Sequence, residues 1–133
     1  MRLRFTTSAC VLGVLLVSAG CGSAQNDAVQ GAATRFEAAV TAQDSTAACG
    51  LLAPATRSEV ESSARQACVE AWADQGVPPG GEVTRVRTYG SMAIVDLQAD
   101  TLFLGRFDGR WRVVAAQCAK RADKPYECQV KGG

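Results

Sequence analysis

Six cysteines and no histidine define the chemistry open to this chain of 133 residues. The absence of histidine excludes Ser-His-Asp and Cys-His nucleophilic catalysis, and it removes the commonest metal ligand and the usual proton carrier near neutral pH. A zinc site made of cysteines alone is also disfavoured, because no two cysteines have the close Cys-x2-Cys to Cys-x4-Cys spacing of such sites. We therefore expect no metal site and no cofactor.

The first 27 residues have the composition of an export signal followed by a tether. Arg2 and Arg4 supply positive charge, and no charged residue then occurs between Phe5 and Gly20. The most apolar part is much shorter than the roughly 20 residues that span a bilayer, so a permanent transmembrane helix is not expected. We predict a signal peptide over residues 1–20 and a short polar tether over residues 21–27.

The segment Ser18-Ala19-Gly20-Cys21 resembles the lipobox of bacterial lipoproteins, in which small residues precede a cysteine. In that family the cysteine thiol takes a diacylglyceryl group, and the signal peptide is cut just before it. The resemblance implies that Cys21 carries fatty acyl groups such as palmitate, which anchor the protein at the extracytoplasmic face of the cell membrane. An ordinary signal peptide with an incidental cysteine is the alternative.

Four further cysteines lie in the part expected to be exported. They are Cys49, Cys68, Cys118 and Cys128. An even number of cysteines in a small exported domain predicts two disulfides, for which three connectivities exist. Sequence order favours Cys49–Cys68 and Cys118–Cys128.

Length and charge bound the remaining chain. Without the 20 signal residues the chain has 113 residues, which predicts a single domain over residues 28–133. Its 12 basic residues, the 14 of the whole chain without Arg2 and Arg4, nearly balance 13 acidic ones. A nearly neutral domain has no general attraction to nucleic acid, so we expect no nucleic-acid partner.

The N-terminal half has the apolar spacing of helices. Apolar residues recur at three- and four-residue steps from Val29 to Val40, with Asp27 as the expected N-cap. Asp44 is the expected N-cap of a short second helix. A capping box at Thr56–Glu59 predicts a third helix, which runs with a break to Trp72.

The C-terminal half has the alternation of strands, beginning after the Pro78-Pro79-Gly80-Gly81 segment. We predict strands over residues 83–89, 91–98, 101–107 and 110–116, with a two-residue hairpin turn at Asp108-Gly109. The tail from Cys118 to Gly133 is expected to be irregular and held by its disulfide. Helices followed by an antiparallel meander predict an α+β domain, with the N-terminal helices packed on one face of a four-stranded sheet.

Several segments also resemble the small exported NTF2-like lipoproteins of actinobacteria. They are the stretch from Asp100 to Cys118, the helix pair "AACGLLAPATRSEVE" and the tail "PYEC". The resemblance implies a curved sheet and helices that enclose a conical pocket. It implies no reaction, because a fold alone does not determine function.

Asp96 is the candidate for catalysis if that pocket is an active site. Some NTF2-like enzymes use an aspartate base with a tyrosine or a second acid in an apolar cavity. The resemblance therefore offers Asp96 as the acid/base residue, with Asp100, Tyr89 and Tyr126 as candidate partners. The alternative, which we favour, is that Asp96 faces solvent opposite an arginine.

Two groups of arginines are candidates for anion binding. Arg85 and Arg87 share a strand face, and Arg106, Arg110 and Arg112 gather around the expected hairpin. Such residues bind a cell-wall polymer, a lipid headgroup or the acidic surface of a partner. The alternative that we favour is a solvated outer face of the sheet, balanced by Glu82, Asp96 and Asp108.

Three classes of function follow. The preferred one is a membrane-anchored binding or interaction module that takes a small apolar ligand or an envelope protein. The second is an NTF2-like enzyme that uses Asp96. The third is an envelope accessory protein that acts through its surface. The sequence favours a role other than catalysis and leaves the choice of ligand open.

Overall fold

The computed structural model describes residues 21–133, and the predicted signal peptide lies outside the described residues. Four helices come first: α1 (Cys21–Thr41), α2 (Ser45–Leu51), α3 (Pro54–Ala64) and α4 (Cys68–Gln75). Five strands follow: β1 (Val83–Tyr89), β2 (Met92–Leu97), β3 (Thr101–Phe107), β4 (Arg110–Arg121) and β5 (Lys124–Lys131). The α+β class is confirmed, but the sheet has five strands and not the expected four.

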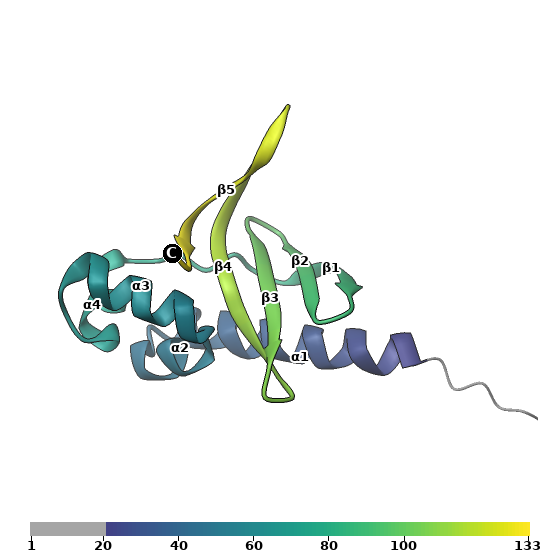
Figure 1. Ribbon diagram of the computed structural model, residues 1–133, viewed down its shortest axis with the longest axis horizontal. Coiled ribbons are helices and arrows are strands. Elements are labelled where there is room, and N and C mark those ends of the chain that lie inside the picture. Colours follow the sequence, from purple (N-terminus) through teal and green to yellow (C-terminus); the bar gives the residue numbers. More distant parts are fainter. Residues whose placement is uncertain (1–20) are drawn as a thin grey trace, which may run out of the picture.

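The strands form one open antiparallel sheet in which each strand pairs with its neighbours along the chain. The helix α1 runs across the sheet, and α2, α3 and α4 lie together beside it (Figure 1). Side chains alternate between two environments along β2, where Val95 is buried and Asp96 is partly exposed. We call the side of the sheet that packs on the helices the covered face, and the other side the open face.

The helix α1 begins six residues before the expected N-cap, so the residues expected to form a tether are helical. Two contacts with β1 and the following turn explain the extension. The Gln25 amide donates a hydrogen bond to the carbonyl oxygen of Gly90 at 2.9 Å, and the Thr88 hydroxyl donates to the Asn26 side-chain oxygen at 2.7 Å. These long-range partners hold the first turns of α1 against the sheet, which the sequence pattern alone does not reveal.

The starts of the next two helices differ in their capping. Asp44 caps α2 as predicted, because its Oδ1 accepts a hydrogen bond from the Ala47 N–H at 2.9 Å. The predicted capping box at Thr56–Glu59 is wrong, since α3 already begins at Pro54, a residue that has no N–H to satisfy. Thr56 is buried inside α3 instead, and its hydroxyl donates to the Val114 carbonyl oxygen at 2.8 Å.

The expectation of an irregular tail is wrong. The strand β4 continues to Arg121 and pairs with β5, and this long hairpin projects beyond the rest of the sheet (Figure 1). Cys118 lies directly opposite Cys128 in the register of the two strands, and their disulfide crosses the pair. Residues 119–125 are all exposed, so this part of the hairpin lacks the alternation of apolar and polar residues that indicates a strand.

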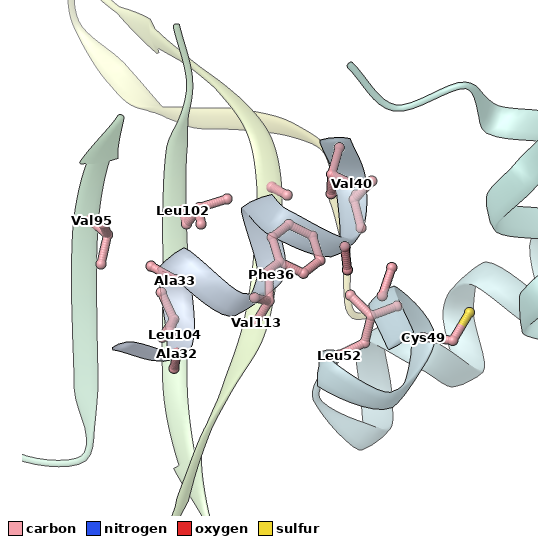
Figure 2. Packing of buried hydrophobic residues seen from close by; sticks show 14 of the residues in the cluster. Ala32, Ala33, Phe36, Val40, Cys49, Leu52, Val95, Leu102, Leu104 and Val113 are labelled. Carbon is pink, nitrogen blue, oxygen red and sulfur yellow. The ribbon is translucent and has the colours of Figure 1, made fainter. Parts of the chain in front are cut away.

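The core lies between α1 and the covered face. Phe36 of α1 points toward Leu102 and Val113 of the sheet, and Leu52 closes the layer on the side of α2 (Figure 2). The Phe36 ring meets Trp72 of α4 edge to face, with 5.7 Å between centroids. Beside this contact the buried disulfide Cys49–Cys68 joins α2 to α4, so both expected disulfide pairings are confirmed.

Candidate functional site

Asp96 lies on the open face, where Arg87 of the neighbouring strand holds it. The Nη2 atom of Arg87 donates to both carboxylate oxygens, at 2.9 and 2.8 Å. The side chains of Arg87 and Asp96 are 24% and 23% exposed. Asp96 therefore stands opposite an arginine, as the favoured alternative expects, but its side chain does not face solvent and forms the acidic half of a largely buried ion pair.

An aromatic contact from the far edge of the sheet completes the surroundings of Arg87. Tyr126 of β5 lies close enough to Arg87 to influence its charge, and it packs edge to face on Phe103 of β3 with ring centroids 5.1 Å apart. Lys120 of β4 lies over the Tyr126 ring at 5.9 Å. The Tyr126 side chain thus reaches the open face from the β4–β5 hairpin, and the side chains of Arg87, Asp96, Phe103 and Tyr126 form what we call the open-face cluster.

The guanidinium charge of Arg87 is supported by this cluster. Burial lowers the pKa of Arg87, but the Asp96 carboxylate and the neighbouring Tyr126 side chain oppose that effect and leave the pKa raised. Of the predicted partners of Asp96, the structure brings Tyr126 into this arrangement. Tyr89 lies at the end of β1 with 60% of its surface exposed, outside the cluster.

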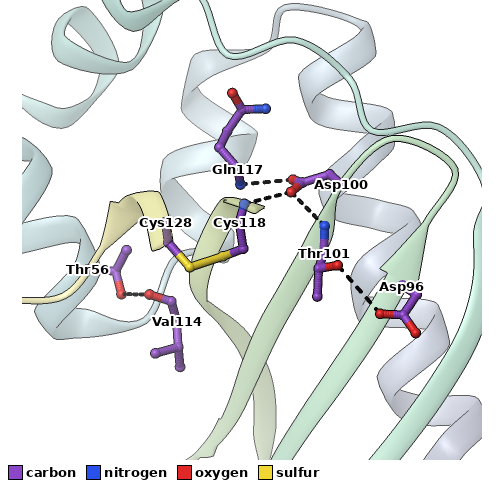
Figure 3. The surroundings of a disulfide bond; sticks show 8 residues. All are labelled: Thr56, Asp96, Asp100, Thr101, Val114, Gln117, Cys118 and Cys128. Carbon is purple, nitrogen blue, oxygen red and sulfur yellow. Dashed lines mark hydrogen bonds between the residues drawn. A yellow bond between two sulfur atoms is a disulfide. The ribbon is translucent and has the colours of Figure 1, made fainter. Parts of the chain in front are cut away.

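Asp100, the other predicted partner, has a structural role. Its carboxylate accepts hydrogen bonds from the backbone N–H groups of Thr101 at 2.6 Å, Gln117 at 2.9 Å and Cys118 at 2.9 Å (Figure 3). Gln117 has a positive φ of 56°, a conformation that non-glycine residues adopt rarely. Asp100 therefore stabilises the irregular step in β4 from which the disulfide-bonded hairpin departs.

A buried carboxylate on α1 was not anticipated. Glu37 is only 8% exposed, and its Oε2 accepts a hydrogen bond from the Gly80 N–H at 2.7 Å. Burial raises the pKa of Glu37, and the nearby charge of Asp100 adds to the rise, while the N–H groups of Gly80 and Gly81 counteract it. Its place four residues after Ala33 and three before Val40, within the apolar stripe, is the sequence signal that could have revealed it.

The segment that contacts Glu37 has no room for a side chain. A Cβ atom on Gly80 would lie 2.6 Å from Cδ1 of Leu97 and 2.7 Å from Cβ of Asp100. Beside Glu37 lies a shallow groove of about 750 Å³ between α1 and the start of β1. Glu37 therefore holds Gly80 and Gly81, which connect the helices to the sheet, in place at the edge of this groove.

The arginines do not form one surface. Arg87 belongs to the open-face cluster, whereas Arg110 and Arg112 line a separate hollow of about 520 Å³ together with Arg35 of α1. Arg112 is fixed there by a hydrogen bond of 2.7 Å from its Nη1 to the Gly50 carbonyl oxygen. Arg35 had no place among the candidates, because only the packing of α1 against the β3–β4 hairpin brings it to these strand residues.

Neither a metal-binding cluster nor a membrane-spanning helix occurs within residues 21–133. That part of the chain contains no group of three or more His, Cys, Asp or Glu side chains able to hold a metal ion. Within the same range, no helix has both the length and the hydropathy needed to cross a membrane. In comparisons with protein-family models, curated proteins and solved structures, no match to this chain is found.

Proposed function

We propose that this chain is a lipid-anchored extracytoplasmic protein of the NTF2-like kind, attached through Cys21, that acts as a binding or interaction module. The observation that carries the proposal is the use of the cysteines. All four cysteines after residue 21 are paired in two disulfides, a state typical of proteins outside the reducing cytoplasm. This pairing agrees with an exported chain whose lipobox-like segment ends at Cys21.

The start of α1 supports an anchor placed close to the domain. Because α1 begins at Cys21, acyl chains on this residue would leave no extended spacer between the membrane and the first helix. Two or more acyl chains make a stable anchor, since each buried methylene contributes about 0.8 kcal/mol. The folded domain would then act within a short distance of the membrane surface.

A binding role fits the geometry better than catalysis by Asp96. Both oxygens of that carboxylate already accept hydrogen bonds from Arg87, so the open-face cluster uses it as a structural partner. The hollow lined by Arg35, Arg110 and Arg112 instead offers positive charge to a ligand. The proposal therefore assigns binding to surface hollows and leaves Asp96 a role in stability.

Cell fractionation tests the anchor. The wild-type chain is expected in the membrane fraction, with an intact mass that shows loss of residues 1–20, added acyl groups and two hydrogens lost for each disulfide. Cys21→Ala should appear in the soluble exported fraction or remain uncleaved. Ala24→Ser, a change of an exposed residue in the same turn of α1, is the matched control and should behave as wild type. Membrane retention of a cleaved Cys21→Ala chain would refute the anchor.

A further inference from the structure

A hollow bounded by three arginines lies where α1, α2 and the β3–β4 hairpin meet. We call it the basic hollow; it has a volume of about 520 Å³ and is flanked by Arg35, Arg110 and Arg112. Three of its lining residues are the glycines Gly31, Gly50 and Gly109, which add no side chain to the wall. The hollow therefore presents positive charge around a space that side chains leave unfilled.

The charge of the basic hollow is not neutralised by ion pairs within the fold. The ion pairs formed between residues 21 and 133 involve Arg57, Arg87 and Arg121, none of which lines this hollow. One carboxylate, that of Asp27, also lines it, which leaves an excess of two positive charges. Guanidinium groups bind phosphate and carboxylate through paired N–H donors, so an anionic group suits this space.

A second hollow adjoins the first along the seam between α1 and α2. This apolar hollow has a volume of about 590 Å³ and shares Arg35, Gly50 and Leu51 with the basic hollow. Its remaining wall consists of four alanines and one acid, which are Ala38, Ala39, Ala42, Ala47 and Asp44. The Oδ1 atom of Asp44 accepts the Ala47 N–H and is committed to capping α2.

We infer that the two hollows together bind one anionic amphiphile, with its phosphate or carboxylate head among the arginines and its acyl chain along the alanine-lined seam. The shared residues Arg35, Gly50 and Leu51 place the two hollows side by side, and the order of charge and apolar surface matches such a molecule. The inference rests on the binding role proposed above and deepens it by naming the class of ligand. The occupant is a single molecule held in the groove, as opposed to the surface of a bilayer.

Titration with monomeric detergents tests the ligand class. The probe is dodecyl phosphate below its micelle concentration, added to the exported chain carrying Cys21→Ser. Trp111 lines the basic hollow, so its fluorescence reports binding when Trp72 is replaced by phenylalanine. Each methylene between octyl and dodecyl phosphate should tighten binding by up to about fourfold, the equivalent of about 0.8 kcal/mol. Dodecyl trimethylammonium should bind at least tenfold more weakly than dodecyl phosphate.

Paired variants locate the site. Arg35→Gln with Arg110→Gln should weaken dodecyl phosphate binding at least tenfold. The matched control, Arg85→Gln with Arg106→Gln, removes the same charge from exposed positions outside both hollows and should bind as wild type. Ala42→Glu should block the apolar hollow, whereas Ala64→Glu at an exposed position of α3 should not. Circular dichroism must show that each variant is folded.

Several results would overturn the inference. Equal affinity for the phosphate and the ammonium detergent would show that the charge of the hollow does not select the ligand. Equal loss of affinity in the arginine pair and in its control would show that the ligand does not bind in the basic hollow. Binding to anionic vesicles without binding of monomeric dodecyl phosphate would indicate a membrane surface contact instead. A native mass of the membrane-extracted protein separates the two proposals. A retained molecule of another class refutes the amphiphile alone, and an empty protein that also fails to bind the detergents refutes ligand binding in the hollows as well.

Discussion

The two faces of the sheet use the same strands for different purposes. On the covered face, Leu102 and Leu104 of β3 are completely buried against the helices. On the open face, Phe103 between them packs on Tyr126 of the β4–β5 hairpin. The covered face therefore holds helices and sheet together, whereas the open face sets the position of one hairpin. Because side chains alternate along β3, neighbouring residues of one strand contribute either to the core or to the position of the β4–β5 hairpin.

The largest effect is expected when neighbouring residues on the two faces are replaced by alanine. Leu102→Ala should lower the free energy of unfolding by about 2–5 kcal/mol, because it leaves a cavity under α1. Phe103→Ala should cost about 1–2 kcal/mol, because its ring is only partly buried. Urea denaturation measures both. Equal losses would show that the open face contributes to the core as much as the covered face does.

Removal of each disulfide tests the same difference between the packed core and the β4–β5 hairpin. The chain-entropy model assigns about 3 kcal/mol to each bridge, since the cysteines are 19 and 10 residues apart. The Cys49→Ala/Cys68→Ala pair should lower the melting temperature more than Cys118→Ala/Cys128→Ala, because it also empties buried space between α2 and α4. The second pair should mainly increase hydrogen exchange in β5. A larger drop in melting temperature for the hairpin pair would contradict this order.

Glu37 is the exception among the buried apolar residues between α1 and the sheet. Glu37→Ala should lower the free energy of unfolding by about 1–3 kcal/mol, because the Gly80 N–H loses its acceptor. Glu37→Gln keeps an acceptor and removes the charge, which makes it the matched control. Denaturant titrations of both variants and the wild type measure the two effects.

The pH dependence of Glu37 has a defined sign. Its folded pKa lies above the ordinary value of 4.5, so the folded state binds this proton more tightly than the unfolded state does. The stability that Glu37 contributes is fully present below about pH 4.5 and is lost as pH rises through the raised pKa. Glu37→Gln should therefore gain stability relative to wild type as pH rises from 4 to 8. A constant difference between the two would show that the Glu37 pKa is not raised.

The smallest expected effect concerns the ion pair of the open face. Asp96→Asn and Arg87→Gln should show a coupling of about 1 kcal/mol in a double-mutant cycle of unfolding free energies. The pair is only about a quarter exposed, which keeps the coupling measurable. Coupling near zero would mean that the open-face cluster depends on the aromatic contact between Phe103 and Tyr126 alone.

Sequence patterns were sufficient where local chemistry determines the structure. The turn at Asp108-Gly109 forms with positive φ at both residues, as its composition predicts. The end of α4 at Gly76 likewise has the left-handed conformation that glycine favours. The predictions failed at the start of α1 and in the β4–β5 hairpin, because contacts with distant residues and solvent exposure on both faces leave no local pattern.

The residues of the candidate sites divide in the same way. The sequence by itself determined the α+β order, because helical spacing and strand alternation are local patterns. It also favoured the disulfide pairing that the structure shows and an arginine opposite Asp96. The tertiary structure decided which arginine meets Asp96, that Glu37 is buried, and that Arg35 joins Arg110 and Arg112. The residues concerned lie on separate elements and are up to 77 positions apart, as Arg35 and Arg112 are. Only the folding of α1, the sheet and the β3–β4 hairpin against one another brings them together.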